Sequence, residues 1–169
     1  MAHKRSKAVF AAAAGIGFNS RRCFPASSLH SIAIHAVDGR GKDCGVSAAP
    51  MKGDYNFSAL GIAVESRWEG KTKFISGPSY ATAIAAGAAA SFLEFARCNL
   101  KLDDPTDQEW LCSADGIREV LRLMSTEIDG YNCIAPSEFF SSGSTIKSIC
   151  DIIMMMVRKG RLQRSRNVH

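Results

Sequence analysis

The segment 76–97 restricts the fold more than any other part of the sequence, because it is long, rich in small residues and almost uncharged. After a Ser-Gly-Pro-Ser turn, only Glu94 and Arg97 carry a charge, and both lie near its far end. A surface helix would show a polar stripe, which is missing here. The sequence therefore predicts a central helix buried on all sides, roughly 27 Å long at 1.5 Å per residue.

Ser79 stands in the first turn of this predicted helix. The unpaired N–H groups and the positive end of the helix dipole would face any negative charge that develops beside its hydroxyl. Two interpretations are open at this point. Ser79 is either a reactive residue or only the N-cap of the helix, since serine is a preferred cap.

Three segments ahead of the helix have the patterns of β-strands. Residues 9–14 form a short apolar run typical of a buried strand, and residues 31–38 form a second strand. Residues 57–66 alternate and predict a strand pair, followed by a polar turn at 68–73.

The last third of the chain is predicted to be mainly helical. Residues 102–107 are polar and contain a helix start, and apolar residues recur at helical spacing over 116–124. We expect that helix to end at 127–131. A final helix over 144–158 carries an apolar stripe, which we interpret as a packing face.

The segment around Ser79 also resembles the serine motif of subtilisin-like serine peptidases (subtilases), which is Gly-Thr-Ser-x-Ala-x-Pro-x-x-Ala-Gly. Two positions differ, because Pro78 stands in place of Thr and Ala83 in place of Pro. The matching residues are Gly77, Ser79, Ala81, Ala86 and Gly87. The predicted strands resemble the same family in the same order, and Phe24-Pro25 resembles its aromatic-Pro turn, where a cis proline is expected.

The resemblance covers about residues 8–140 and is closest to fungal intracellular subtilase-like proteins. It implies a three-layer α/β fold with a parallel sheet and a buried central helix. It also implies the C-terminal portion of such a domain, with the N-terminal part missing. On this view residues 1–7 are a basic N-terminal extension, 8–140 a partial peptidase domain, and 141–169 an amphipathic helix with a basic tail.

The resemblance further implies that Ser79 is the catalytic nucleophile and that Gly15, Pro78 and Ser79 form the oxyanion region. Gly15 occupies the position of the family's oxyanion Asn, and Pro78 that of its Thr, so the Ser79 N–H is the remaining donor. Asn19 lies four residues beyond the Asn position. The family's catalytic Asp and His precede this part of the domain and are not carried over. We interpret His35 as a strand histidine and His30 as a surface histidine.

The implied function is peptide-bond hydrolysis by a serine endopeptidase fragment that is inactive alone, because the triad Asp and His are absent. Its partners would be a peptide or protein substrate and a missing N-terminal half or partner chain. The alternative is a non-catalytic binding or regulatory module.

Charge and cysteine content restrict the other function classes. The net charge is +5, but the two ends of the chain hold eight basic and no acidic residues, whereas the interior holds 13 basic and 16 acidic residues. We therefore expect solvated basic tails and no specific nucleic-acid partner. The six cysteines show neither C-x-x-C pairs nor zinc-ligand spacing, which predicts free thiols in a reducing, intracellular and cytoplasmic setting, without metal or cofactor. No apolar run is long enough to cross a bilayer, so no membrane partner is expected.

Overall fold

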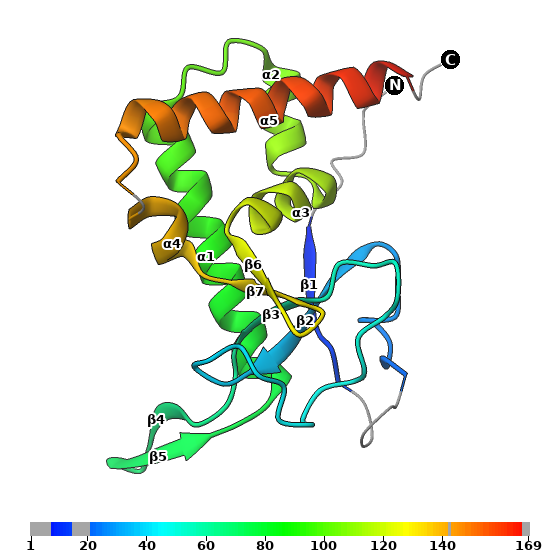
Figure 1. Cartoon of the computed structure of the whole chain (residues 1–169), viewed down its shortest axis with the longest axis vertical. Coiled ribbons are helices and arrows are strands. Elements are labelled where there is room, and N and C mark those ends of the chain that lie inside the picture. The colour runs from blue at the N-terminus through cyan, green and yellow to red at the C-terminus, as the bar shows by residue number, and fades with distance from the viewer. Residues whose placement is uncertain (1–7, 15–20, 142, 167–169) are drawn as a thin grey trace.

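The computed structural model describes residues 8–14, 21–141 and 143–166. A five-stranded sheet has the order β1-β2-β3-β7-β6, in which all neighbours are parallel except the pair β6–β7 (Figure 1). Its strands are β1 (Val9–Ala12), β2 (Ser31–Val37), β3 (Phe57–Leu60), β6 (Ser125–Ile128) and β7 (Tyr131–Ile134). The predicted α/β class and the parallel sheet are therefore confirmed.

The described helices are α1 (Pro78–Asn99), α2 (Pro105–Leu111), α3 (Ala114–Leu123), α4 (Pro136–Ser141) and α5 (Ile146–Arg166). Two of the helices, α1 and α3, pack directly against one face of this sheet, and the other helices pack on the helix layer. Ile32, Ile34 and Ala36 of β2 belong to the same buried cluster as α1, α3 and α5. Side chains alternate along a strand, so Ala33 and His35 point to the opposite face, which the loops 21–30 and 38–56 cover.

Helix α1 crosses β1, β2 and β3, as expected of a central helix (Figure 1). Its buried residues form a single stripe on the side of the sheet, and they are Ala81, Ala85, Ala89, Phe92 and Ala96. On the opposite side, Tyr80 and Ile84 are 38% and 40% exposed. The expectation of burial on all sides is therefore wrong, because nothing in the described part of the chain covers the outer side of α1.

Small residues set the close approach of α1 to the sheet. A Cβ added to Gly61 would lie 2.6 Å from the Ala36 Cβ and 2.9 Å from the Gly77 carbonyl oxygen. The Gly77 N–H donates to the Gly61 carbonyl at 2.7 Å. This contact ties the start of α1 to the carboxyl end of β3.

Two hairpins differ from the predictions. The segment predicted as a polar turn at 68–73 contains the end of β4 (Val64–Trp68), a short turn and the start of β5 (Lys71–Ile75). Strands β4 and β5 pair antiparallel, and their hairpin projects from the domain (Figure 1). The predicted helix end at 127–131 is instead the β6–β7 turn, where Asp129 and Gly130 both have positive φ. Asp-Gly favours this turn, so the helical prediction missed a hairpin signal.

The C-terminal helix is longer and better anchored than predicted. Helix α5 extends to Arg166, and Arg161 and Arg164 form ion pairs with the buried Asp107, so the predicted solvated tail is wrong for these two residues. The predicted packing face is confirmed at Ile149, Ile153, Met156 and Val157, whereas Ile146 and Ile152 lie outside it. The Trp110 ring lies where a Cβ of Gly160 would be, so glycine is needed there.

Two smaller predictions are confirmed. The Phe24–Pro25 peptide bond is cis, and all six cysteines are free. None of the described helices has the length and apolar character needed to cross a membrane.

Candidate functional site

Ser79 is the second residue of α1 and is exposed to solvent. The N-cap is Gly77, whose φ of 153° is rarely adopted by residues with a side chain, and Pro78 takes the first helical position. Within the described residues, neither the hydroxyl nor the N–H of Ser79 has a hydrogen-bond partner. The interpretation of Ser79 as the N-cap is therefore wrong.

Neighbouring residues hold the start of α1 in place. The Tyr80 N–H donates to the Gly77 carbonyl at 3.2 Å, and the Thr82 hydroxyl donates to the Pro78 carbonyl at 2.7 Å. Just ahead of the turn, the Ser76 hydroxyl accepts from the Ala63 N–H at 2.9 Å. These bonds leave the Ser79 N–H free at the positive end of the helix, where it can donate to an anion.

Neither of the two described histidines lies beside Ser79. His35 is fully buried and belongs to the face of β2 opposite α1, and its ring packs edge-on against Tyr131 at 5.2 Å. His30 is exposed and precedes β2, whereas Ser79 adjoins the carboxyl end of the sheet, roughly 20 Å away along the strand. The interpretations of His35 as a strand histidine and His30 as a surface histidine are confirmed.

The remaining predicted site residues are only partly placed. Pro78 is the first residue of α1 and has no N–H to donate. Gly15 and Asn19 lie outside the described residues, so the oxyanion region stays a prediction apart from Pro78 and Ser79. No group of His, Cys, Asp and Glu residues in the described ranges could hold a metal ion.

Burial lowers the pKa of His35 to about 4, and the Arg22 charge acts in the same direction. Asp43 and Asp54 oppose this shift, as does the nearby backbone of Ala48, although neither ring nitrogen has a hydrogen-bond partner among the described residues. His35 is therefore neutral at pH 7 and cut off from solvent. It is a poor candidate for a base that exchanges protons with a substrate.

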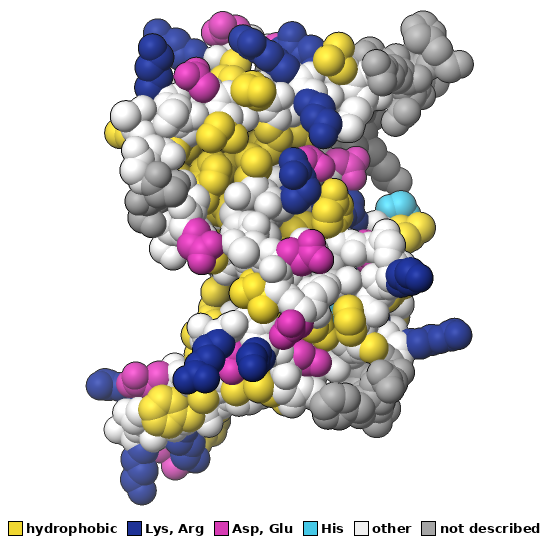
Figure 2. All heavy atoms as spheres, in the orientation of Figure 1, with side chains coloured by type: hydrophobic (Ala, Val, Ile, Leu, Met, Phe, Trp, Pro, Cys, Tyr) yellow, Lys and Arg dark blue, Asp and Glu magenta, His cyan; other side chains and the backbone are white. Residues whose placement is uncertain are grey.

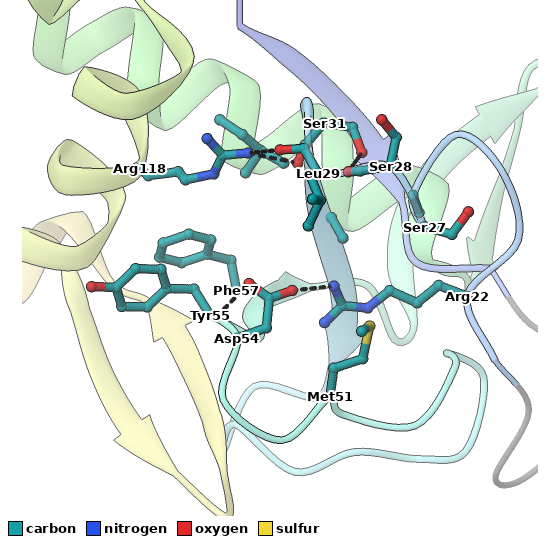
Figure 3. A pocket seen from close by; sticks show the side chains of 13 residues that line it. Arg22, Ser27, Ser28, Leu29, Ser31, Met51, Asp54, Tyr55, Phe57 and Arg118 are labelled. Atoms are coloured by element: carbon teal, nitrogen blue, oxygen red, sulfur yellow. Dashed lines mark hydrogen bonds and ion pairs between the residues drawn. The ribbon is translucent and has the colours of Figure 1, made fainter. Parts of the chain in front are cut away.

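A cavity of about 190 Å³ lies at the amino ends of β2 and β3, at the sheet edge opposite to Ser79 (Figure 3). Arg22 donates to Asp54 at 2.8 Å, and Arg118 of α3 donates to the carbonyl oxygens of Leu29 and Ser31 at 2.6 and 3.1 Å. The sequence analysis missed this cluster, because no local motif connects Arg22 with Arg118. Both guanidinium groups already have partners, although the buried Arg22 Nε has none among the described residues, and we interpret the cluster as structural.

No family model matches the sequence, and no curated protein matches it. Solved structures do match. The chain is similar to the prenylagaramide maturation protease PagA, with a TM-score of 0.59 and 20% identity over 80% of this chain and 50% of that one. It is also similar to the self-cleaved protease domain of PatA, with a TM-score of 0.56 and 18% identity over 87% and 50% of the two chains. For the structure of the subtilase cytotoxin SubAB assembly, the TM-score is 0.50 and the identity is 19%, over 90% of this chain and 52% of that one.

These similarities establish the fold. The mainly parallel sheet with its packed helices is the fold of subtilisin-like protease domains. This chain spans about half the length of each of these structures. The closer relation to fungal intracellular proteins, the C-terminal portion and the domain boundaries stay predictions.

Proposed function

We propose that this chain is the serine-bearing part of a subtilisin-like serine endopeptidase, with Ser79 as the nucleophile. The observation that carries the proposal is the exposed Ser79 hydroxyl at the positive end of α1, within a subtilisin-like fold. The free Ser79 N–H would donate to the oxyanion of a peptide carbonyl under attack.

The chain alone is proposed to be inactive. A serine hydroxyl needs a base to take its proton and a third group to orient that base. His35 is sealed on the wrong face of the sheet and His30 lies at the wrong edge, so the base would come from outside the described residues or from another polypeptide. In subtilisin, removal of the base lowers kcat about 10⁶-fold, a known value for that enzyme.

A second candidate function is a non-catalytic binding or regulatory module on the same fold. The absence of a described histidine beside Ser79 favours it. The substitution at Pro78 favours it too, because proline cannot supply the hydroxyl that the family's threonine would provide. Under this proposal Ser79 would have no more reactivity than an ordinary exposed serine.

A fluorophosphonate probe distinguishes the two functions, because it labels serines that an adjacent base has activated. The peptidase proposal predicts that the folded chain alone is not labelled. Ser79 should become labelled when the polypeptide carrying the base is present. Ser79→Ala must abolish that label, and Ser76→Ala is the matched control in the same turn. A reconstituted domain that cleaves peptides without labelling Ser79 would contradict the role of Ser79. A complete, folded complex without any label would favour the binding module.

A further inference from the structure

The β4–β5 hairpin projects from the domain and carries both charged and hydrophobic side chains (Figure 2). Trp68 and Phe74 are 63% and 69% exposed. Aromatic residues are enriched in surfaces that bind other proteins. The proposed function gives these rings no role, so the hairpin needs an explanation of its own.

The strand register separates the side chains of the hairpin into two faces. Lys71 pairs with Trp68, and Lys73 lies two residues further along β5, so the three side chains share one side, which we define as the lysine face. Glu65 and Arg67 of β4 lie on the opposite face. Within the described residues, neither lysine has an ion pair. The lysine face therefore presents two positive charges beside an exposed indole ring.

The outer edge of β5 is open in the described part of the chain. The turn consists of Glu69 and Gly70, both with positive φ, as a type I′ hairpin requires. Lys71 therefore bonds inward to β4, and the alternation along the strand points the backbone N–H and C=O groups of Thr72 and Phe74 outward. Among the described strands, β5 pairs only with β4. A strand added at this edge would place every second side chain beside the two lysines.

Hydrogen bonding and charge together indicate what this edge can bind. Alternating N–H and C=O groups match an extended polypeptide, whereas a row of phosphates offers no donor for the carbonyl oxygens. A second copy of the chain does not fit, because two paired β5 edges would bring lysines opposite lysines. Carboxylates at every second residue of the added strand would instead meet a lysine each.

We propose that the outer edge of β5 is a binding site for an extended acidic polypeptide segment, which adds a third strand to the hairpin. Two carboxylate side chains of this segment lie on the lysine face, beside Lys71 and Lys73. Its backbone pairs with Thr72 and Phe74. The site uses neither the hydroxyl nor the N–H of Ser79, so it stands independently of the proposed peptidase activity.

Titration of the full chain with two matched peptides tests this site. One peptide alternates glutamate with threonine over about eight residues, within the usual length of a strand. The other has glutamine in place of each glutamate. Anisotropy of a dye on the peptide measures binding. We expect the glutamate peptide to bind about fivefold tighter or more, because cross-strand pairs of opposite charge are favourable, and this advantage should shrink at high salt.

Variants of the hairpin separate charge from strand addition. Lys71→Glu combined with Lys73→Glu should reverse the preference, so that a peptide with lysine in place of glutamate binds instead. Thr72→Pro should abolish binding, because it removes an outward N–H and leaves the bonds to β4 intact. Arg67→Glu, on the opposite face, is the matched control and should keep the affinity within about twofold. Circular dichroism checks that each variant is folded.

Three results would overturn the proposal. The first is no binding of the glutamate peptide, or equal binding of the two peptides. The second is an equal loss in Arg67→Glu and in the double lysine variant, which would mean that net charge alone attracts the peptide. The third is full binding by Thr72→Pro, which would mean that no strand is added.

Discussion

The two faces of the central sheet are built from the same strands but with different chemistry. On the helix face, Ile32, Ile34 and Phe57 pack against apolar side chains of the helices. On the loop face, a small cluster of alanines is buried, the fully buried His35 packs against the Tyr131 ring, and the Ser58 hydroxyl lies 3.2 Å from the Cys133 sulfur. The helix face is therefore held by apolar contact, whereas the loop face also holds buried polar groups that must stay neutral. Neighbouring residues of β2 allow each face to be tested separately.

The largest expected effect is on the helix face. Ile34→Ala removes a side chain with no solvent exposure and leaves a cavity under α1, which should lower the free energy of unfolding by about 2–5 kcal/mol. Urea unfolding monitored by circular dichroism measures this change. Ile146→Ala, at an exposed isoleucine, is the control and should stay within about 0.5 kcal/mol. Equal losses for both variants would contradict the assignment of Ile34 to the core.

The next effect is specific to the loop face and depends on pH. The pKa of His35 is lowered from 6.5 to about 4 in the folded chain, so only the unfolded chain takes up this proton as the pH falls between those values. Above pH 6.5 His35 contributes no pH dependence. Between pH 6.5 and 4 it should lower the free energy of unfolding by about 3 kcal/mol in total. Below pH 4 its contribution no longer changes.

His35→Phe isolates that contribution from the carboxylates that also titrate in acid. The variant should be about as stable as the parent chain at pH 7, because both ring nitrogens of His35 lack hydrogen-bond partners among the described residues. Its advantage should grow to about 3 kcal/mol at pH 4. Urea midpoints at several pH values provide the measurement, and His35→Leu is a second variant in case Phe does not fit. Parallel pH profiles for parent and variants would show that His35 is not sealed.

The smallest expected effect is at Ser79. Its hydroxyl makes no capping bond, so Ser79→Ala should change the free energy of unfolding by less than about 0.5 kcal/mol. Thermal unfolding of the two proteins measures this difference. A loss of about 1 kcal/mol or more would mean that the serine supports the helix start, as a cap does. A neutral result would show that any effect of this variant on labelling is chemical.

The parts of the fold that follow from local patterns were predictable. An apolar run indicates the strand at 31–38, and an apolar stripe indicates the final helix. Gly77-Pro78-Ser79 marks the start of α1. The burial of α1 was not predictable, because alanine and glycine are compatible with a covered face and an open one alike. Only the arrangement of the other elements shows which side of the helix is covered.

Features that depend on distant partners were also missed. Arg161 and Arg164 look like a free basic tail, and only the fold brings Asp107 beneath them. The hairpin at Asp129-Gly130 was a different kind of error, because its turn signal was present and the helical spacing before it was given more weight. For the candidate site, the sequence located Ser79. It could not show that His35 faces away from Ser79 until β2 was paired with its neighbours.

Because α1 is packed along one side only, the positions of its two ends are coupled. Phe92 is fully buried near its far end and packs beside Phe139 and Phe140, roughly 20 Å along the helix from Ser79. A stiff rod held along one side transmits a tilt at one end to the other. The packing of aromatic side chains nearly four turns away would therefore affect where the Ser79 end of the helix lies.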